Sequence, residues 1–258
     1  METSAFKSVG VPFCFVLQVL QGPSITSNKE LAHVSCLMNL TYYKLRIWEK
    51  YQKKQPLINN NMQHKQLIDY LKRYGNISEQ EEQNIRKAFS EQTAKKKDIL
   101  IRKNSVCNKL FFVNKGLLRA YYEDDFGNET TRRIAWEHGF ITNMDDFLKT
   151  ETENNETIEC IENAEFLEVL KSDWDVLVSN SENLGKIHQI ILAKYVKINI
   201  RRVEHLTALT PEKKLIYFNE NFPALKNRIT DVVLATFLGM SRITLIRTRE
   251  KYRKNAKK

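Results

Sequence analysis

Residues 230–251 of the chain, TDVVLATFLGMSRITLIRTREK, predict two short helices separated by a glycine turn. Thr230 is a typical N-cap for the first helix, because its hydroxyl can accept an otherwise unpaired backbone N–H. Gly239 breaks that helix, since glycine adopts the left-handed backbone of a tight turn without steric strain. Ser241 can cap the second helix in the same way, and this helix extends to about residue 251. The stretch therefore predicts a helix-turn-helix unit.

The apolar residues of this stretch fit the small core that the two helices of such a unit share. Ala235 lies four residues before Gly239, where the first helix must approach the second closely. Thr248 departs from the pattern, because Ile or Val usually occupies the corresponding position. The expected core residues are Leu234, Leu238, Met240 and Leu245.

The second helix carries basic residues where a helix would meet the major groove of DNA. Arg242 lies in its first turn and Arg247 lies five residues later, and arginine can bond both acceptor atoms of a guanine edge. Thr244 is expected to contact a base or a phosphate. The residues expected to contact phosphates are Arg249, Lys251, Arg253 and Lys254. The predicted DNA-binding residues are Thr230, Ser241, Arg242, Ile243, Thr244, Arg247, Arg249 and Lys251.

The positive charge of the chain is concentrated at its C-terminus. The 258 residues carry a net charge of +10, and residues 228–258 contain nine Lys or Arg against two acids, a net of +7. Residues 1–61 contain seven Lys or Arg against three acids, which leaves a net of −1 for the residues between. A basic C-terminus on a near-neutral body indicates a polyanion as partner. The alternative is a solvated, frayed basic tail.

Upstream of this unit the pattern changes from helix to strand and back to helix. Residues 63–92 have helical spacing, with Ser78 and Glu81 as a capping box for a second helix. Residues 98–170 contain short strand-like runs separated by turns, which is typical of a β-barrel or sandwich. The runs are Ile99–Ile101, Leu110–Val113, Leu117–Tyr122, Thr131–Ala135, Phe140–Ile141, Thr157–Ile161 and Phe166–Leu170.

Residues 173–208 have helical spacing and carry two apolar stripes. The stripes are Ile187, Ile191, Tyr195 and Ile198, and Leu192, Val196, Val203 and Leu206. Two stripes predict burial on two sides, one against the barrel and the other against a second copy of the helix. The alternative is an ordinary core helix within a monomer. Thr210 and Pro211 then begin a further helix, which Pro223 ends.

Residues 1–61 differ from the rest of the chain and end in an asparagine run before Met62. We expect the functional protein to begin at Met62, with the first segment as an appendage. Its apolar run, Val9–Leu20, is shorter than the ~20 residues needed to cross a bilayer. It also lacks the basic segment and the cleavage site of a secretory signal. A cytoplasmic protein without a membrane partner is therefore expected.

Residues of the types that carry catalysis or bind metals are dispersed along the chain. Cys14, Cys36, Cys107 and Cys160 lack the close spacing of a zinc or iron–sulfur site, and free thiols in a reducing compartment fit this scatter. The five histidines form no local motif with Asp, Ser or Cys. We therefore expect no catalytic residues, no metal, no cofactor and no enzymatic activity.

The chain resembles the Crp–Fnr family of bacterial regulators, the catabolite-activator-protein type. The motif LGMSRITLIR (238–247) is similar to the turn and recognition helix of that family, and FFVNKGLLRAYY (111–122) is similar to its early barrel strands. TPEKKLIYFNENFPALKNRIT (210–230) resembles the lead-in helix of the versions common in Bacteroidetes-type bacteria. The resemblance covers about residues 62–255.

The resemblance implies an α+β fold with four parts. These are an extension (1–61), a β jelly-roll sensor domain similar to cyclic-nucleotide-binding domains (62–183), a dimerisation helix (184–208) and a helix-turn-helix domain (209–258). It also implies a homodimer that binds double-stranded DNA at an operator with two-fold-related half-sites, with RNA polymerase as a candidate further partner. The expected function is sequence-specific transcription regulation. The alternative is a ligand-binding regulatory module whose C-terminal helices dock on a protein partner, which the charge of the recognition helix disfavours.

The implied nucleotide site departs from the family pattern. Thr142 and Asn143 stand where the resemblance implies a Gly-Glu pair for the ribose, and residues 154–160 lack the Arg-Ser pair for the cyclic phosphate. Residues 123–168 contain fourteen acids and three basic residues, a net of −11, which predicts an acidic pocket that repels a phosphate. We therefore predict a degenerate site that does not bind cyclic AMP. Ile243 stands where the type member has an acidic base-reading residue, so the operator sequence should differ.

Overall fold

The second helix of the described chain begins with the predicted capping box. The computed structural model describes residues 60–149 and 154–255, and begins with α3 (Asn60–Leu71) and α4 (Glu79–Ala88). The N–H of Glu81 donates to Ser78 Oγ (3.3 Å), and the N–H of Ser78 donates to Glu81 Oε2 (2.7 Å). Both side chains thus satisfy backbone donors at the start of α4. Predictions about the N-terminal extension, its apolar run and its two cysteines lie outside the described residues.

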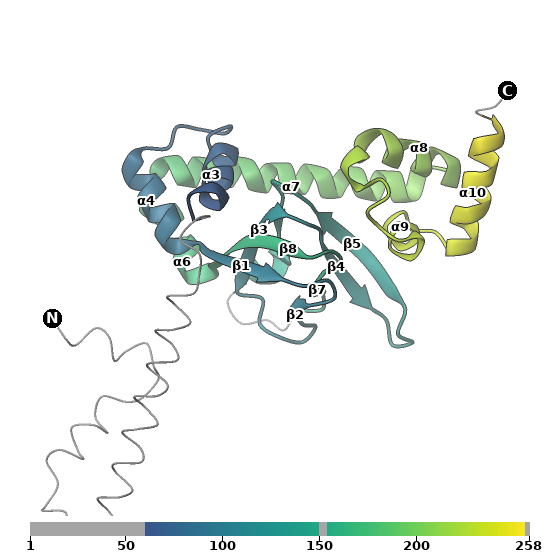
Figure 1. The fold of residues 1–258 in the computed structure, drawn as a ribbon, viewed down its shortest axis with the longest axis horizontal. Coiled ribbons are helices and arrows are strands. Elements are labelled where there is room, and N and C mark those ends of the chain that lie inside the picture. Colours follow the sequence, from purple (N-terminus) through teal and green to yellow (C-terminus); the bar gives the residue numbers. More distant parts are fainter. Residues whose placement is uncertain (1–59, 150–153, 256–258) are drawn as a thin grey trace, which may run out of the picture. The chain divides into compact units, whose positions relative to one another are not determined.

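Within the described ranges, the strands form two antiparallel four-stranded sheets, with the orders β1-β8-β3-β6 and β2-β7-β4-β5 (Figure 1). The strands are β1 (Ser90–Ala94), β2 (Ile99–Ile101), β3 (Lys109–Lys115), β4 (Leu118–Glu123), β5 (Glu129–Ala135), β6 (Phe140–Ile141), β7 (Thr157–Cys160) and β8 (Ala164–Leu170). Each predicted run overlaps one of these strands. β1 has no counterpart among the runs, and its first three residues, 90–92, were wrongly expected to be helical. Its sequence SEQTA is polar, and it forms a strand by pairing with the distant β8.

The apolar faces of the strands enclose the main core, which includes Phe147 of the short helix α5 (Met144–Leu148). Fully buried strand residues of this core include Phe111, Phe112, Leu118, Ile158 and Leu167. Gly116 makes the turn between β3 and β4 at a φ of +95°, and a Cβ there would lie 2.4 Å from the carbonyl oxygen of Asn163. Both observations require glycine at this turn.

The predicted helical stretch 173–208 is divided into two helices. α6 (Lys171–Ser179) has Asn180 as its C-cap, and Ser181 caps α7 (Glu182–Ala208) by accepting the N–H of Leu184 (3.1 Å). α7 packs its first half on the barrel core, where Leu184 and Ile187 are buried. The first half of α7 thus belongs to the barrel domain, and its second half extends toward the C-terminal helices (Figure 1).

The second half of α7 exposes an apolar row. Val196, Ile200 and Val203 are 53%, 55% and 61% exposed in the single chain. Two residues do not follow the predicted stripes. Ile198 belongs to the stripe that packs on the barrel, yet it is 61% exposed. Leu206 belongs to the exposed stripe, yet it is only half-exposed because it lies against the turn at Gly239.

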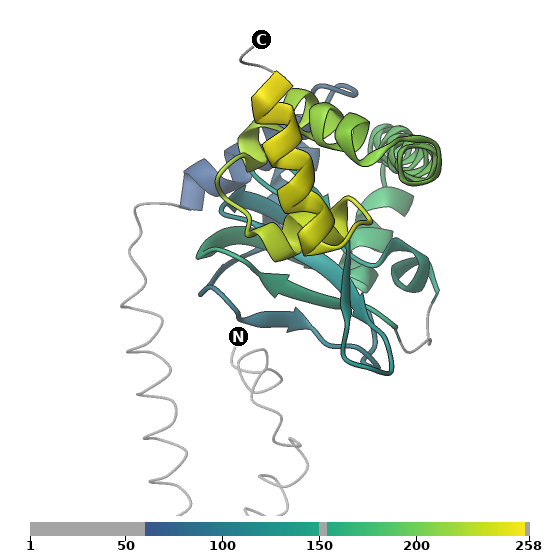
Figure 2. The ribbon, with the colours of Figure 1, turned by 90° about the vertical axis from the view of Figure 1, so that its right-hand side faces the viewer.

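The C-terminal part consists of α8 (Pro211–Asn221), a short 3-10 helix (Pro223–Leu225), α9 (Asp231–Phe237) and α10 (Arg242–Asn255), gathered near the end of α7 (Figures 1 and 2). A second apolar core joins these helices to the barrel. Its buried members include Leu215, Phe218, Leu225, Leu234 and Leu245, together with Leu117 and Ile134 of the barrel. No helix among residues 60–149 and 154–255 combines the length and the apolar character needed to cross a membrane.

Candidate nucleic-acid interface

The predicted caps and turn of the helix-turn-helix are present. Thr230 Oγ1 accepts the N–H of Val233 (3.3 Å) at the start of α9. Gly239 has a φ of +62°, so the chain reverses there in the left-handed region. Ser241 Oγ then accepts the N–H of Thr244 (3.1 Å) at the start of α10, which extends beyond the predicted end to Asn255.

The two helices share a small buried core. Its members include the predicted residues Leu234, Ala235, Leu238 and Leu245, with Met240 partly buried against them. Thr248 is also buried, and its hydroxyl donates to the carbonyl oxygen of Thr244 (2.8 Å). The core therefore accepts a polar residue at a position that usually holds Ile or Val, because the hydroxyl is satisfied within its own helix.

The outer face of α10 presents three of the predicted contact residues to solvent. Arg242 and Arg247 are exposed, and Ile243 is 64% exposed. Neither arginine forms an ion pair with a carboxylate of the described residues. Two unpaired guanidinium groups thus flank an apolar side chain in the first half of the helix. A base edge can be recognised by such a surface through paired donors and a methyl contact.

The two other basic residues of the predicted set are engaged within the chain. Arg249 pairs with Asp231 at the start of α9, and Lys251 donates to Glu212 of α8 (2.8 Å). These ion pairs connect α10 to its neighbouring helices. A phosphate would have to compete with these carboxylates for Arg249 and Lys251. Arg253 and Lys254, in contrast, are exposed and form no ion pair within the described chain.

Arg228 was counted in the basic C-terminus, but its side chain pairs with two acids of the barrel and is therefore not available to a polyanion. Its guanidinium donates to Glu137 in the turn after β5 (2.9 Å) and to Glu162 in the turn before β8 (2.7 Å). The hydrogen bonds from Arg228 lower the pKa of Glu137 to about 2. A further link joins α9 to β5, where the hydroxyls of Thr236 and Thr131 are 2.8 Å apart.

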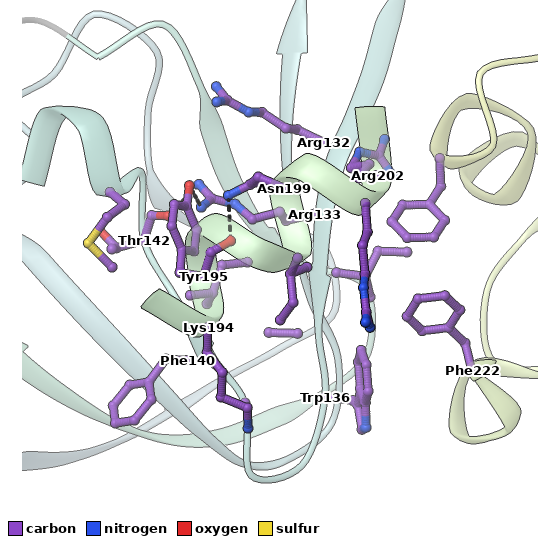
Figure 3. A pocket seen from close by; sticks show the side chains of 18 of the residues that line it. Arg132, Arg133, Trp136, Phe140, Thr142, Lys194, Tyr195, Asn199, Arg202 and Phe222 are labelled. Carbon is purple, nitrogen blue, oxygen red and sulfur yellow. Dashed lines mark hydrogen bonds between the residues drawn. The ribbon is translucent and has the colours of Figure 1, made fainter. Parts of the chain in front are cut away.

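A cavity of about 440 Å³ lies beside α7, between β5, β6 and the C-terminal helices (Figure 3). Thr142 and Phe140 lie at one end, and Trp136, Arg202 and Phe222 lie at the other (Figure 3). Its lining is mostly apolar and aromatic. Its charged residues are Arg132, Arg133, Glu137, Lys194, Arg201, Arg202 and Lys214. The wall is therefore basic, unlike the acidic pocket that the charge count predicted, because most of the counted acids lie outside the lining.

The residues at the implied nucleotide site are occupied by internal contacts. Thr142 is buried and donates to the carbonyl oxygen of Lys109 (2.8 Å). Asn143 is buried and donates to Asp146. Glu156, fully buried, accepts hydrogen bonds from Arg132 (2.6 Å) and Arg133 (3.2 Å).

Within residues 60–149 and 154–255, no group of three or more His, Cys, Asp or Glu side chains is placed to hold a metal ion. Cys107 and Cys160 are buried as free thiols, and burial raises the pKa of Cys160 to about 12. A thiol with so high a pKa is a poor nucleophile.

Sequence reasoning missed the contacts that join the C-terminal unit to the barrel. The one local hint of these contacts is Glu137, an acidic residue in a predicted turn, where it can pair with a basic residue from another part of the chain. No local pattern identifies Arg228 as its partner, since the two residues are far apart in the sequence. The cavity was missed for the same reason, because its walls come from separate parts of the chain.

Solved structures of regulators share this fold. FixK2 of Bradyrhizobium japonicum aligns with a TM-score of 0.58 at 11% identity, over 65% of this chain and 86% of that protein. A protein of Eubacterium rectale, named as a transcriptional regulator of the crp/fnr family, aligns with a TM-score of 0.56 at 17% identity, over 69% of this chain and 85% of its own. The c-di-GMP-responsive global regulator CLP of Xanthomonas campestris aligns with a TM-score of 0.55 at 16% identity, over 69% and 93%.

At these identities the likeness establishes the fold. The predicted α+β architecture, a barrel-like domain followed by a long helix and a C-terminal helical region, is confirmed. No family model matches the chain, and no curated protein matches it.

Proposed function

We propose that this chain is a sequence-specific DNA-binding transcription regulator of the Crp–Fnr type. The observation that carries the proposal is the outer face of α10, where Arg242, Ile243 and Arg247 are exposed and both arginines lack an acidic partner in the described chain. This face belongs to a packed helix-turn-helix, and the fold is that of solved transcription regulators.

In the proposed complex, the N-terminal half of α10 enters the major groove. Arg242 and Arg247 donate to guanine edges, and Ile243 contacts a thymine methyl group. Arg253 and Lys254 bind phosphates and add affinity without sequence preference. The hydroxyls of Thr230, Ser241 and Thr244 cap or brace the helices, which fixes the angle at which α10 meets the groove.

We propose a homodimer formed through α7, with Val196, Ile200 and Val203 at the centre of the interface. These side chains form one row at helical spacing and lie exposed in the single chain. Two chains related by a two-fold axis would place their recognition helices in successive major grooves, roughly 34 Å apart. Such a regulator would act in the cytoplasm, with RNA polymerase as a candidate partner on the promoter.

The proposed regulator does not depend on cyclic AMP. The support for this proposal comes from the side chains at the implied nucleotide site, because the cavity wall is basic and its net charge would not repel a phosphate. Glu156 is a buried carboxylate in the segment where the resemblance implies an Arg-Ser pair, and it already pairs with Arg132 and Arg133. A cyclic phosphate placed there would displace this carboxylate as the partner of the two arginines.

The experiment that tests the proposal is selection of bound DNA from a random pool by the full chain, followed by affinity measurements on the selected sequence. Arg242→Ala should weaken binding to the selected DNA by about 1–3 kcal/mol and reduce the preference over random DNA. Lys254→Ala is the matched control and should weaken binding to both DNAs alike. Enrichment of no sequence, or equal losses on both DNAs for Arg242→Ala, contradicts the assignment.

A further inference from the structure

The cavity beside α7 contains a cation that no acid of the described chain neutralises. Arg202 donates one hydrogen bond, to the carbonyl oxygen of Thr131 (2.9 Å), and its guanidinium lies 4.5 Å from the centre of the Phe237 ring. It forms no ion pair with a described carboxylate. Removal from water, together with the charges of Arg132 and Arg133, lowers the pKa of Arg202 to about 10.

The neighbouring arginines differ from Arg202 because they share a counterion. Arg132 and Arg133 both donate to the buried carboxylate of Glu156. Arg133 also donates to the hydroxyl of Tyr195 on α7. Burying a cation without a counterion is unfavourable, so the uncompensated charge at Arg202 indicates an anion that the described residues do not supply.

The wall around this end of the cavity is aromatic. The Trp136 and Phe222 rings meet edge to face at 6.0 Å, and the Phe222 and Phe237 rings do so at 5.8 Å. Tyr217 also lines the cavity and lies 6.1 Å from the Phe222 ring. Ring faces and edges of this kind favour a flat, aromatic body over a flexible or hydrated one.

We propose that the end of the cavity next to α9 binds an aromatic monoanion, with its carboxylate on Arg202 and its ring among Trp136, Phe222 and Phe237. A single carboxylate can accept two hydrogen bonds from the guanidinium of Arg202, and the cavity of about 440 Å³ is large enough for a two-ring molecule. This site lies at the opposite end of the cavity from Thr142, where the nucleotide site is implied (Figure 3).

The position of the site gives the ligand a route to the DNA-binding unit. Its wall combines β5 of the barrel, the end of α7, and α8 and α9 of the C-terminal part. An anion on Arg202 would act directly on the contact between Arg202 and Phe237, the last residue of α9. The ligand would thereby change the set of contacts that hold α9 on β5. Regulation of DNA binding by the ligand rests on the proposed function, whereas ligand binding itself does not.

The test uses 1-naphthoate as the probe and calorimetry on the full chain. We expect one 1-naphthoate per chain with a dissociation constant in the micromolar range, and at least tenfold weaker binding of the neutral 1-naphthalenemethanol. Arg202→Gln should weaken 1-naphthoate binding at least tenfold. Lys197→Gln is the matched control, because Lys197 is exposed on the same helix and does not line the cavity.

Equal binding of the acid and the alcohol by the unaltered chain overturns the proposal, and this comparison holds even if Arg202→Gln fails to fold. Unchanged binding by a folded Arg202→Gln variant also overturns it. A parallel titration with the selected DNA separates the two proposals. DNA binding without 1-naphthoate binding refutes the ligand site alone. Binding of 1-naphthoate that depends on Arg202, in a chain that binds no DNA, supports the ligand site and refutes the proposed function.

Discussion

Basic residues on α10 have different roles, and the partner of each side chain decides which. Arg249 pairs with Asp231 of α9, whereas Arg242 and Arg247 have no acidic partner among the described residues. An exposed and unpaired guanidinium can bind a base edge without breaking a native contact. We therefore assign DNA reading to Arg242 and Arg247, and we assign a bracing role to Arg249.

The bracing role of Arg249 predicts a measurable coupling with Asp231. In a double-mutant cycle of alanine substitutions, followed by urea unfolding, the pair should show a coupling free energy of about 0.5–1 kcal/mol, because both groups are partly exposed. The same cycle between Asp231 and the unpaired Arg253 should give a coupling near zero. Equal coupling in the two cycles would remove the distinction drawn between these arginines.

The contact between Arg228 and Glu137 predicts a pH dependence of stability. The folded-state pKa of Glu137 is about 2, below its ordinary value of 4.5, because Arg228 donates to the carboxylate. The stabilisation is therefore complete above pH 4.5 and is lost as the pH falls toward 2. We expect Glu137→Gln to lower the free energy of unfolding by about 1–3 kcal/mol at pH 6, and by progressively less below pH 4.5.

The control for this measurement is Glu220→Gln on α8, since Glu220 is exposed and forms no ion pair within the described chain. Its effect should be small and similar at each pH. A destabilisation by Glu137→Gln that stays constant from pH 6 to pH 3 would mean that the charge of Glu137 does not hold the contact.

At the level of elements, the turn between α9 and α10 depends on Gly239. Its φ is +62°, and a Cβ there would lie 2.8 Å from Leu206 Cδ2 of α7. Gly239→Ala should lower the free energy of unfolding by about 2 kcal/mol, through backbone strain and displacement of Leu206. Gly127→Ala is the matched control, because Gly127 has a φ of +79° but open space around it, and about 1 kcal/mol is expected there. Equal losses would exclude a contribution from the Leu206 contact.

The exposed row on α7 predicts the oligomeric state. Ile200→Glu would place a charge at the centre of the proposed interface, and the desolvation of that charge should convert the dimer to a monomer. Sedimentation analysis of the full chain measures the mass directly. Val176→Glu on α6 also replaces an exposed apolar residue and should leave the dimer intact. A monomeric unaltered chain, or a dimeric Ile200→Glu variant, contradicts dimerisation through α7.

Elements with a strong local signal were predictable from the sequence. The caps at Ser78, Thr210 and Thr230 and the apolar strand runs are local patterns, and the structure confirms them. The polar β1 was not predictable, because its pairing with β8 decides its conformation. The exposure of Ile198 was not predictable either, since helical spacing does not show where α7 leaves the barrel.

At the level of the whole molecule, the sequence predicted the order of the parts but not how they are joined. The basic face of α10 follows from residue types at helical spacing, so its candidate contacts were accessible from the sequence. The core that Leu117 and Ile134 share with the C-terminal helices, and the cavity beside α7, are built from segments that are distant in the chain. Their walls depend on tertiary packing, which a single sequence does not reveal.

The central claim is that the chain binds DNA through the basic face of α10. The most direct test is the affinity of the full chain for its selected DNA as a function of salt concentration. If Arg253 and Lys254 of both chains in a dimer bind phosphates, the logarithm of the binding constant should fall with the logarithm of salt with a slope of about −4. Lys254→Ala should make the slope shallower by about 2. Phosphate contacts weaken strongly between about 50 and 200 mM salt. An affinity that is the same at both concentrations would contradict DNA binding through the basic face of α10.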